Sequence, residues 1–161
     1  MGSGRELHVA HEKLVAFVKS IAGASYYTKL TGVYGQLILP EQEEAVPPYA
    51  CVEIDEDSVR TDQDNDTSMS LVLVDRIYVF VPETSSKPAK ESTIPKQLLQ
   101  ATQDIIKAML TKASTFNTLD GTVGYVKPGN PQPIPAYGTN YGELQFPIEL
   151  GLDLTLEGLG P

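Results

Sequence analysis

The sequence contains one cysteine, two histidines and no tryptophan in 161 residues. A single cysteine excludes an intramolecular disulfide, so the cysteine content does not point to an oxidising compartment. Cys51 lies in the apolar run Tyr49 to Val52, which predicts a small buried side chain and not a reactive thiol. The chain also lacks the roughly 18 unbroken apolar residues that a membrane span needs. Its start, MGSGRELHV, lacks the basic-then-apolar pattern of a signal peptide. We therefore expect a cytosolic protein with no membrane partner.

Short motifs that mark active sites and cofactor sites are missing as well. The sequence contains no G-x-S-x-G, P-loop, G-x-G-x-x-G or H-E-x-x-H. His8 and His11 share a predicted helix, but no third ligand completes a metal site with them. The sequence therefore predicts a protein that is not an enzyme and holds no metal or cofactor.

One acidic segment partly resembles a calcium-binding loop. Asp62, Asp64 and Asp66 have the spacing of the first ligands, but Thr67 replaces the turn glycine and Leu73 replaces the closing glutamate. This departure excludes a high-affinity EF-hand. A calcium-dependent binding module or small hydrolase that uses the three aspartates stays open as the alternative from a different functional class.

Positive charge is scarce, since 12 basic residues face 21 acidic ones for a net charge of -9. The whole excess lies between residues 41 and 66, where ten carboxylates accompany one cation, Arg60. Such a block repels phosphate and argues against direct nucleic-acid binding through that surface. The alternative is a solvated loop that only aids solubility.

Length and a hydrophobic content of 41% predict one domain over residues 1–161. Apolar residues spaced three and four apart predict a helix from Leu7 to Ile21, ended by Gly23. A second helix follows Thr93 as its N-cap, with Pro95 in the first turn. Its core stripe is Ile94, Leu98, Ala101, Ile105 and Ala108, widened by Leu99, Ile106, Met109 and Leu110.

Four strands are predicted, over Tyr49 to Val59, Ser70 to Val81, Thr122 to Lys127 and Glu143 to Leu156. The second is apolar on both faces, which indicates a central strand, and its length of roughly 40 Å predicts that part of it projects. The closing strand alternates apolar and polar residues without error, and its Pro147 predicts a sheet edge or a bulge.

Asp75 and Arg76 interrupt the central strand and point to opposite faces, so each is expected to pair with another group. The connections carry further expectations. Residues 24–48 form a long connection with a possible short strand at Leu37 to Leu39, and Asp55 to Ser68 forms a protruding hairpin or loop. Pro128 to Gly142 is too rich in proline and glycine for regular structure.

Together these elements predict an α+β fold. It has a mixed or antiparallel sheet of about four or five strands, with two helices packed on one side. A projecting acidic hairpin and a Pro/Gly-rich loop complete it.

The order of elements resembles the tail terminator, or tail completion, proteins of long-tailed bacteriophages. The resemblance rests on the strand PPYACVEI, the acidic protrusion, the strand LVLVDRIYVFV, the helix QLLQATQDIIKAML, the turn LDGTV and the closing strand GELQFPIELGLDLTL. It covers about Leu7 to Leu156, and the acidic hairpin and the Pro-rich loop depart most from a minimal member.

The resemblance implies a homo-oligomeric ring, hexameric in the family, that caps the tail tube, ends tail polymerisation and joins the tail to the head. Its implied partners are the tail tube protein and the head-side connector or stopper protein, with DNA only as unbound cargo passing through. The implied place is the tail or neck of the virion, after assembly in the host cytoplasm. Another head-to-tail connector or a baseplate component is the alternative within this structural class.

Two sets of residues are candidates for the ring's working surfaces. Acidic side chains are expected at the lumen or its rim, where they would repel passing DNA: Asp55, Glu56, Asp57, Asp62, Asp64, Asp66, Glu143, Glu149 and Asp153. The long irregular segment Pro131 to Tyr141 is expected to contact a neighbouring subunit or ring, with Ile134, Tyr137 and Tyr141 as its large apolar groups.

Overall fold

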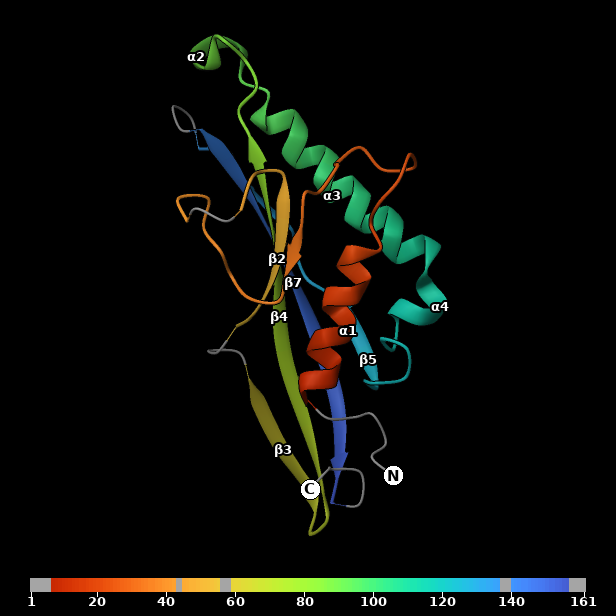
Figure 1. Cartoon of the computed structure of the whole chain (residues 1–161). Helices are drawn as coiled ribbons and strands as arrows, with labels where there is room; N and C mark the ends of the chain where they lie inside the picture. The colour runs from red at the N-terminus through yellow and green to blue at the C-terminus, as the bar shows by residue number, and fades with distance from the viewer. Residues whose placement is uncertain (1–6, 43–44, 56–58, 137–139, 157–161) are drawn as a thin grey trace.

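A computed structural model describes residues 7–42, 45–55, 59–136 and 140–156. It shows a mixed sheet with two main helices packed against it (Figure 1). The elements in chain order are α1 (Leu7–Lys19), β1 (Val33–Tyr34), β2 (Tyr49–Ile54), β3 (Arg60–Asn65), β4 (Ser68–Pro82), α2 (Pro88–Glu91), α3 (Ile94–Thr111), α4 (Ala113–Phe116), β5 (Tyr125–Pro128), β6 (Gln132–Ile134) and β7 (Tyr141–Thr155).

The sheet has seven strands in the described part of the chain, with the main order β1-β2-β4-β7-β5. β3 pairs with β4, and β6 pairs with β7. Only the β1–β2 pair is parallel, so the sheet is mixed. The predicted α+β class is confirmed. The count of four or five strands was too low, because three short strands carry weak sequence patterns.

The core lies between one face of the sheet and the two helices. Alternate residues of β4 and β7 are buried, and the register pairs Ile77 with Phe146 and Leu73 with Leu150. Opposite residues in antiparallel strands share a face, so the two apolar sets form one surface. α1 adds Leu14 and α3 adds Leu98 to the same core.

The first predicted helix is confirmed as α1, which ends at Lys19 shortly before Gly23, a glycine with φ of +99°. The core stripe predicted for the second helix is buried in α3. Its widening was wrong for three residues, because Leu99, Ile106 and Leu110 are 63%, 41% and 75% exposed. α3 meets the sheet with one side, so apolar residues on its outer side face solvent.

Thr93 precedes α3, but its side chain makes no cap hydrogen bond. Instead the Glu83 carboxylate accepts the Thr93 backbone N–H at 3.0 Å and the Thr93 hydroxyl at 3.1 Å. The predicted N-cap position is confirmed, but the Thr93 side chain makes no cap hydrogen bond. Its hydroxyl donates to Glu83, which follows β4, and the same carboxylate accepts the N–H of Thr93 itself.

The connections differ from expectation in three places. The short strand of the 24–48 connection is Val33–Tyr34, while Leu37 and Ile38 pack against an aromatic cluster. β2 ends at Ile54, short of Val59. The Pro/Gly-rich segment contains β6, so the expectation of no regular structure there was wrong.

Pro147 lies in an interior strand and not at the predicted sheet edge. Its carbonyl accepts the Gly129 N–H at 2.8 Å, on the side where β6 pairing stops at Gln145 and β5 pairing starts at Ile148. Backbone N and C=O of one strand residue point to the same side. The missing proline N–H therefore falls in the gap between the two short strands.

The predicted protruding hairpin is confirmed. β3, the first residues of β4 and the last residues of β7 extend beyond the end of α1 (Figure 1). We call this extension, residues 60–71 and 152–156, the arm. Both side-chain faces of β3 are exposed, which fits its all-polar sequence.

Candidate functional site

The candidate surface is the sheet face turned away from α1 and α3, which we call the open face. The register assigns side chains to it, because residues opposite each other in an antiparallel pair point the same way. Its charged members on the strands and their ends are Glu53, Asp55, Arg60, Asp62, Asp64, Arg76, Lys127, Glu143, Glu149 and Asp153. Seven of these ten groups are carboxylates, so the face is acidic.

The structure thus brings six acidic candidates to one face: Asp55, Asp62, Asp64, Glu143, Glu149 and Asp153. Asp66 lies in the turn between β3 and β4. Glu56, Asp57 and Tyr137 lie outside the described residues. Ile134 is opposite Glu143 in the sheet and therefore also faces the open side, where it is exposed.

The β2 end of the open face is covered by residues 34–42 and 45–48 and not by a helix. Tyr49, Cys51 and Phe80 are buried there in an aromatic cluster. The Tyr49 hydroxyl donates to the Ile38 carbonyl at 2.6 Å, and burial raises the Tyr49 pKa. Tyr141, a candidate contact residue, packs edge-on to Phe80 with ring centroids 6.0 Å apart. Tyr141 thus has a packing role within its own chain.

In the middle of the open face, Arg76 joins two strands and a loop end. Its guanidinium donates to Asp55 at 2.8 Å and to the Gln145 side chain at 2.9 Å. The sequence expectation that Arg76 pairs with another group is confirmed. Glu143 lies on the same face, and burial raises the pKa of its carboxyl above the ordinary value.

Towards the arm, Glu149 accepts hydrogen bonds from Arg60 and from the Tyr125 hydroxyl, each at 3.1 Å. The Tyr125 ring lies over Gly151, where an added Cβ would be 1.9 Å from the ring. Gly151 therefore provides the space that lets an aromatic side chain cross the strand.

On the arm itself, Ser70 donates to Asp64 at 2.8 Å and lies 3.3 Å from an Asp153 oxygen. Three strands thereby place two carboxylates around one hydroxyl. Asp62 and Asp64 lie in a paired strand, which differs from the calcium-binding loop of the alternative function. In the described residues no group of three or more His, Cys, Asp or Glu side chains is placed to hold a metal ion.

The other charged interruption of β4, Asp75, points into the core and is fully buried. His11 of α1 bonds it through Nδ1 at 3.0 Å and bonds the Gly35 carbonyl through Nε2 at 2.9 Å. The expectation that Asp75 pairs with another group is confirmed. An imidazolium donates from both nitrogens, and the Asp75 bond is the main cause of the raised His11 pKa.

Sequence reasoning missed the partner of Asp75, although a signal for it exists. His11 lies on the apolar side of α1, four residues after Leu7 and three before Leu14. A polar residue on that side needs a partner in the core, and Asp75 is the acidic residue of the central strand.

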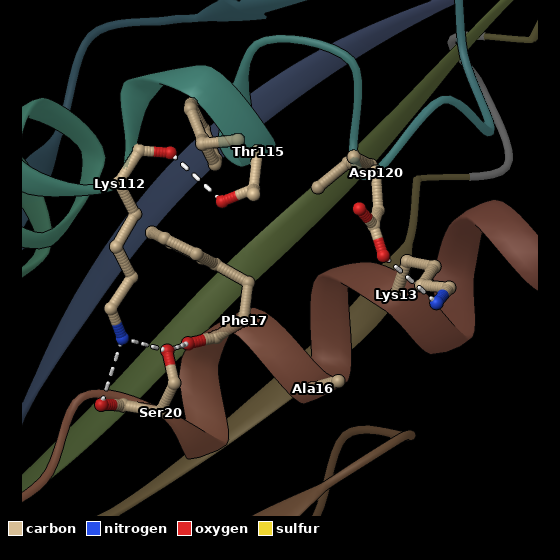
Figure 2. Close-up of a pocket in the computed structure, with 9 residues that line it drawn as sticks. Lys13, Ala16, Phe17, Ser20, Lys112, Thr115 and Asp120 are labelled. Atoms are coloured by element: carbon tan, nitrogen blue, oxygen red, sulfur yellow. Dashed lines mark hydrogen bonds and ion pairs between the residues drawn. The ribbon is translucent and has the colours of Figure 1, made fainter.

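A cleft lies between α1 and α4 on the helix side (Figure 2). Its volume is about 310 Å³. Lys112 donates to the Ser20 carbonyl at 3.2 Å, and Lys13 pairs with Asp120 at 3.4 Å. The acidic candidates do not line this cleft, and both its ammonium groups are occupied by the cleft wall.

No helix in the described part of the chain is both long and apolar enough to cross a membrane. A scan of the sequence against models of known protein families finds no match. A search of curated proteins likewise finds no matching relative.

Proposed function

We propose that this chain is a structural virion protein that assembles into a ring at the end of a phage tail tube. In this proposal the ring ends tail polymerisation and joins the tube to the head-side connector, as the resemblance to tail terminators implies. The single observation that carries the proposal is the acidic open face. A sheet with helices on one side leaves the part of the other side beyond the covered β2 end free for a shared channel, and here that side bears most of its charge as carboxylate.

The proposed role of the open face is to line the lumen or its rim. Six or so copies of this face around a channel would sum to a strong negative potential. DNA passing through would be repelled from the wall and would not stick to it. Arg60 and Arg76 each pair with a carboxylate of the same face, so they tie the strands together more than they attract phosphate.

The β6 segment is the proposed contact with a neighbouring subunit or ring. Ile134 is exposed beside Glu143, whereas Tyr141 is engaged with Phe80 in its own chain. We therefore assign the intermolecular contact to Ile134. Ile134→Ser is expected to weaken ring assembly or tail joining without unfolding the subunit. If the variant assembles and joins tails as the wild type does, the Ile134 contact is contradicted.

Native mass spectrometry together with negative-stain electron microscopy tests the ring itself. The expected result is a closed ring whose diameter matches the tail tube, formed alone or on added tube. A protein that stays monomeric with the tube protein present contradicts the proposal. If rings form with the open-face carboxylates on their outer circumference, the proposed ring is supported but the assignment of these carboxylates to the lumen is overturned.

A further inference from the structure

The arm carries an apolar strip that the rest of the described chain leaves partly exposed. Met69, Leu154 and Leu156 line one hollow near the arm's tip. Met69 is 37% exposed and Leu156 is 72% exposed. The pairing of Met69 with Leu154 shows that the strip lies on the helix side of the sheet, opposite Asp62, Asp64 and Asp153. The arm is therefore apolar on one face and acidic on the other.

A second apolar strip runs along the outer side of α3, formed by Leu99, Ile106 and Leu110. These residues are seven and four apart and so follow one helical face. No described element packs over them. Each strip is small. If the two strips packed against each other, both would be removed from water.

The charges beside the two strips have opposite signs. The arm holds four aspartates and one arginine. Asp66 lines the same hollow as the strip, whereas Asp62, Asp64 and Asp153 lie on the opposite face. The charged residues of α3 and its end are Lys96, Lys107 and Lys112, apart from Asp104, which is buried and accepts two backbone N–H bonds. Complementary charge of this kind orients two surfaces as they meet.

Within one chain the two strips cannot meet. The arm extends past the end of α1, whereas α3 lies against the other end of the sheet (Figure 1). The arm's strands are continuous with the central pair β4–β7, so the arm is not free to fold back. Two different surfaces on one chain suit a heterologous contact, the type that closes into a ring.

We propose that the arm of one copy docks on α3 of the next copy. Met69, Leu154 and Leu156 cover Leu99, Ile106 and Leu110, with Asp66, which lines the same hollow as the strip, near the α3 lysines. This inference rests on the proposed ring and adds to it one further pair of surfaces between neighbouring copies, beside the contact assigned to Ile134.

Site-specific crosslinking tests the contact. Cys51 is buried and is replaced in a Cys51→Ala background, into which Leu110→Cys and Leu156→Cys are introduced together. A short bismaleimide is expected to produce a ladder of covalent oligomers from this pair. The matched control combines Leu156→Cys with Leu39→Cys, which places an exposed residue on the segment that covers the open face. The control is expected to give no ladder.

Charge substitution provides an independent measurement. Leu110→Asp or Leu156→Asp alone is expected to weaken self-association about tenfold or more, because each buries a charge in an apolar contact. The double variant Leu110→Asp with Leu156→Lys is expected to recover much of that loss. Circular dichroism checks that each subunit stays folded, and sedimentation velocity measures the association.

The outcomes separate this contact from the ring. Rings without a selective ladder, or rings unaffected by both aspartate variants, overturn the arm contact and leave the proposed function intact. Absence of rings even with the tube protein overturns the proposed function. A selective ladder without tube-capping rings keeps the contact but contradicts the tail role.

Discussion

At the scale of single residues, the contact between His11 and Asp75 fixes α1 to the central strand. Asp75 is fully buried, and its second oxygen, Oδ1, has no hydrogen-bond partner among the described residues. The groups that face His11 are Asp75 on β4, the Gly35 carbonyl and, at longer range, Glu53 on β2. All three favour the protonated imidazole.

Replacing His11 is expected to destabilise the fold. His11→Phe leaves Asp75 buried without its partner, which costs about 3 kcal/mol for the loss of one member of a buried pair. Urea unfolding at pH 6 measures the change. His8→Gln, an exposed position on the same helix, is the control and is expected to change little. Equal effects of the two variants would contradict the anchoring role.

The same contact predicts a pH dependence of stability. Because the folded-state pKa of His11 is raised, its contribution is fully present below the ordinary value of about 6.5 and is lost as pH rises through the folded pKa. The wild-type free energy of unfolding is therefore expected to fall above that range, by comparison with His11→Phe. Parallel pH profiles for the two proteins would rule this out.

Gly151 is required by the ring of Tyr125 that crosses it. Gly151→Ala places a methyl group where the ring now lies and is expected to cost about 1–3 kcal/mol by overpacking. In a Tyr125→Ala background the added methyl group has no ring to clash with. Gly151→Ala should therefore cost less stability there than in the wild type. A double-mutant cycle by urea unfolding tests this, and strictly additive changes would refute it.

At the scale of elements, α3 carries apolar residues on two sides. One side is buried against the sheet and the other is exposed, although the residues on both are equally apolar. Ile105 is buried and Ile106 is 41% exposed. Ile105→Ala is expected to cost about 2–5 kcal/mol because it leaves a cavity, whereas Ile106→Ala should stay within about 0.5 kcal/mol in the monomer. Urea unfolding at low protein concentration compares the two neighbours, and similar losses would show that the outer strip is not free in the monomer.

The start of α3 depends on Glu83, whose carboxylate accepts bonds from Ser92, Thr93 and Ser85. These bonds lower its pKa to about 2. A depressed folded pKa gives stability that is present above the ordinary value of about 4.5 and is lost as pH falls towards 2. Glu83→Gln is therefore expected to lower the urea midpoint at pH 7 and to differ little from wild type near pH 2. A constant difference at both pH values would contradict this.

At the scale of the whole molecule, the distribution of charge divides the domain into two sides. Carboxylates collect on the open face and at the arm, and the exposed lysines of α1 and α3 lie on the helix side. In a ring, these two sides would face different surroundings.

Neutralising the open face is expected to make assembled rings retain DNA. Asp62→Asn together with Asp64→Asn removes two negative charges per copy, so DNA passing the rim meets less repulsion. Retention of a DNA fragment by purified rings, measured at low and moderate salt, checks this. Glu12→Gln with Glu91→Gln removes the same charge from positions off the open face. Equal retention by both double variants would argue against the lumen assignment.

Much of the fold could be predicted because its pattern is local. The alternation of β7, the apolar side of α1 and the core stripe of α3 all follow from side-chain periodicity, which is set by the geometry of a strand or helix. The division of Asp75 and Arg76 between opposite faces followed from the same period of two. The acidic candidates on β7 were assigned to one face for this reason.

Other features depended on which segments meet, and no local pattern carries that information. The apolar residues Leu99 and Leu110 look equivalent to Met109 in sequence, yet their exposure depends on what packs over the outer side of α3. Thr93 stands at the predicted N-cap position, but its hydroxyl donates to Glu83 and makes no cap hydrogen bond. Pro147 was predicted to lie at an edge or a bulge, because the gap between β5 and β6 exists only once both strands pair with β7.

The sequence by itself determined that this protein is acidic in one segment and carries no familiar catalytic motif, because composition and residue spacing do not depend on how the chain folds. It also determined the order and type of the main elements, because periodicity is a local property. Only the tertiary structure decided that the acidic residues of β3, β7 and the end of β2 share one face. Only the structure left apolar strips on the arm and on α3 uncovered, because burial depends on neighbours that are distant in sequence.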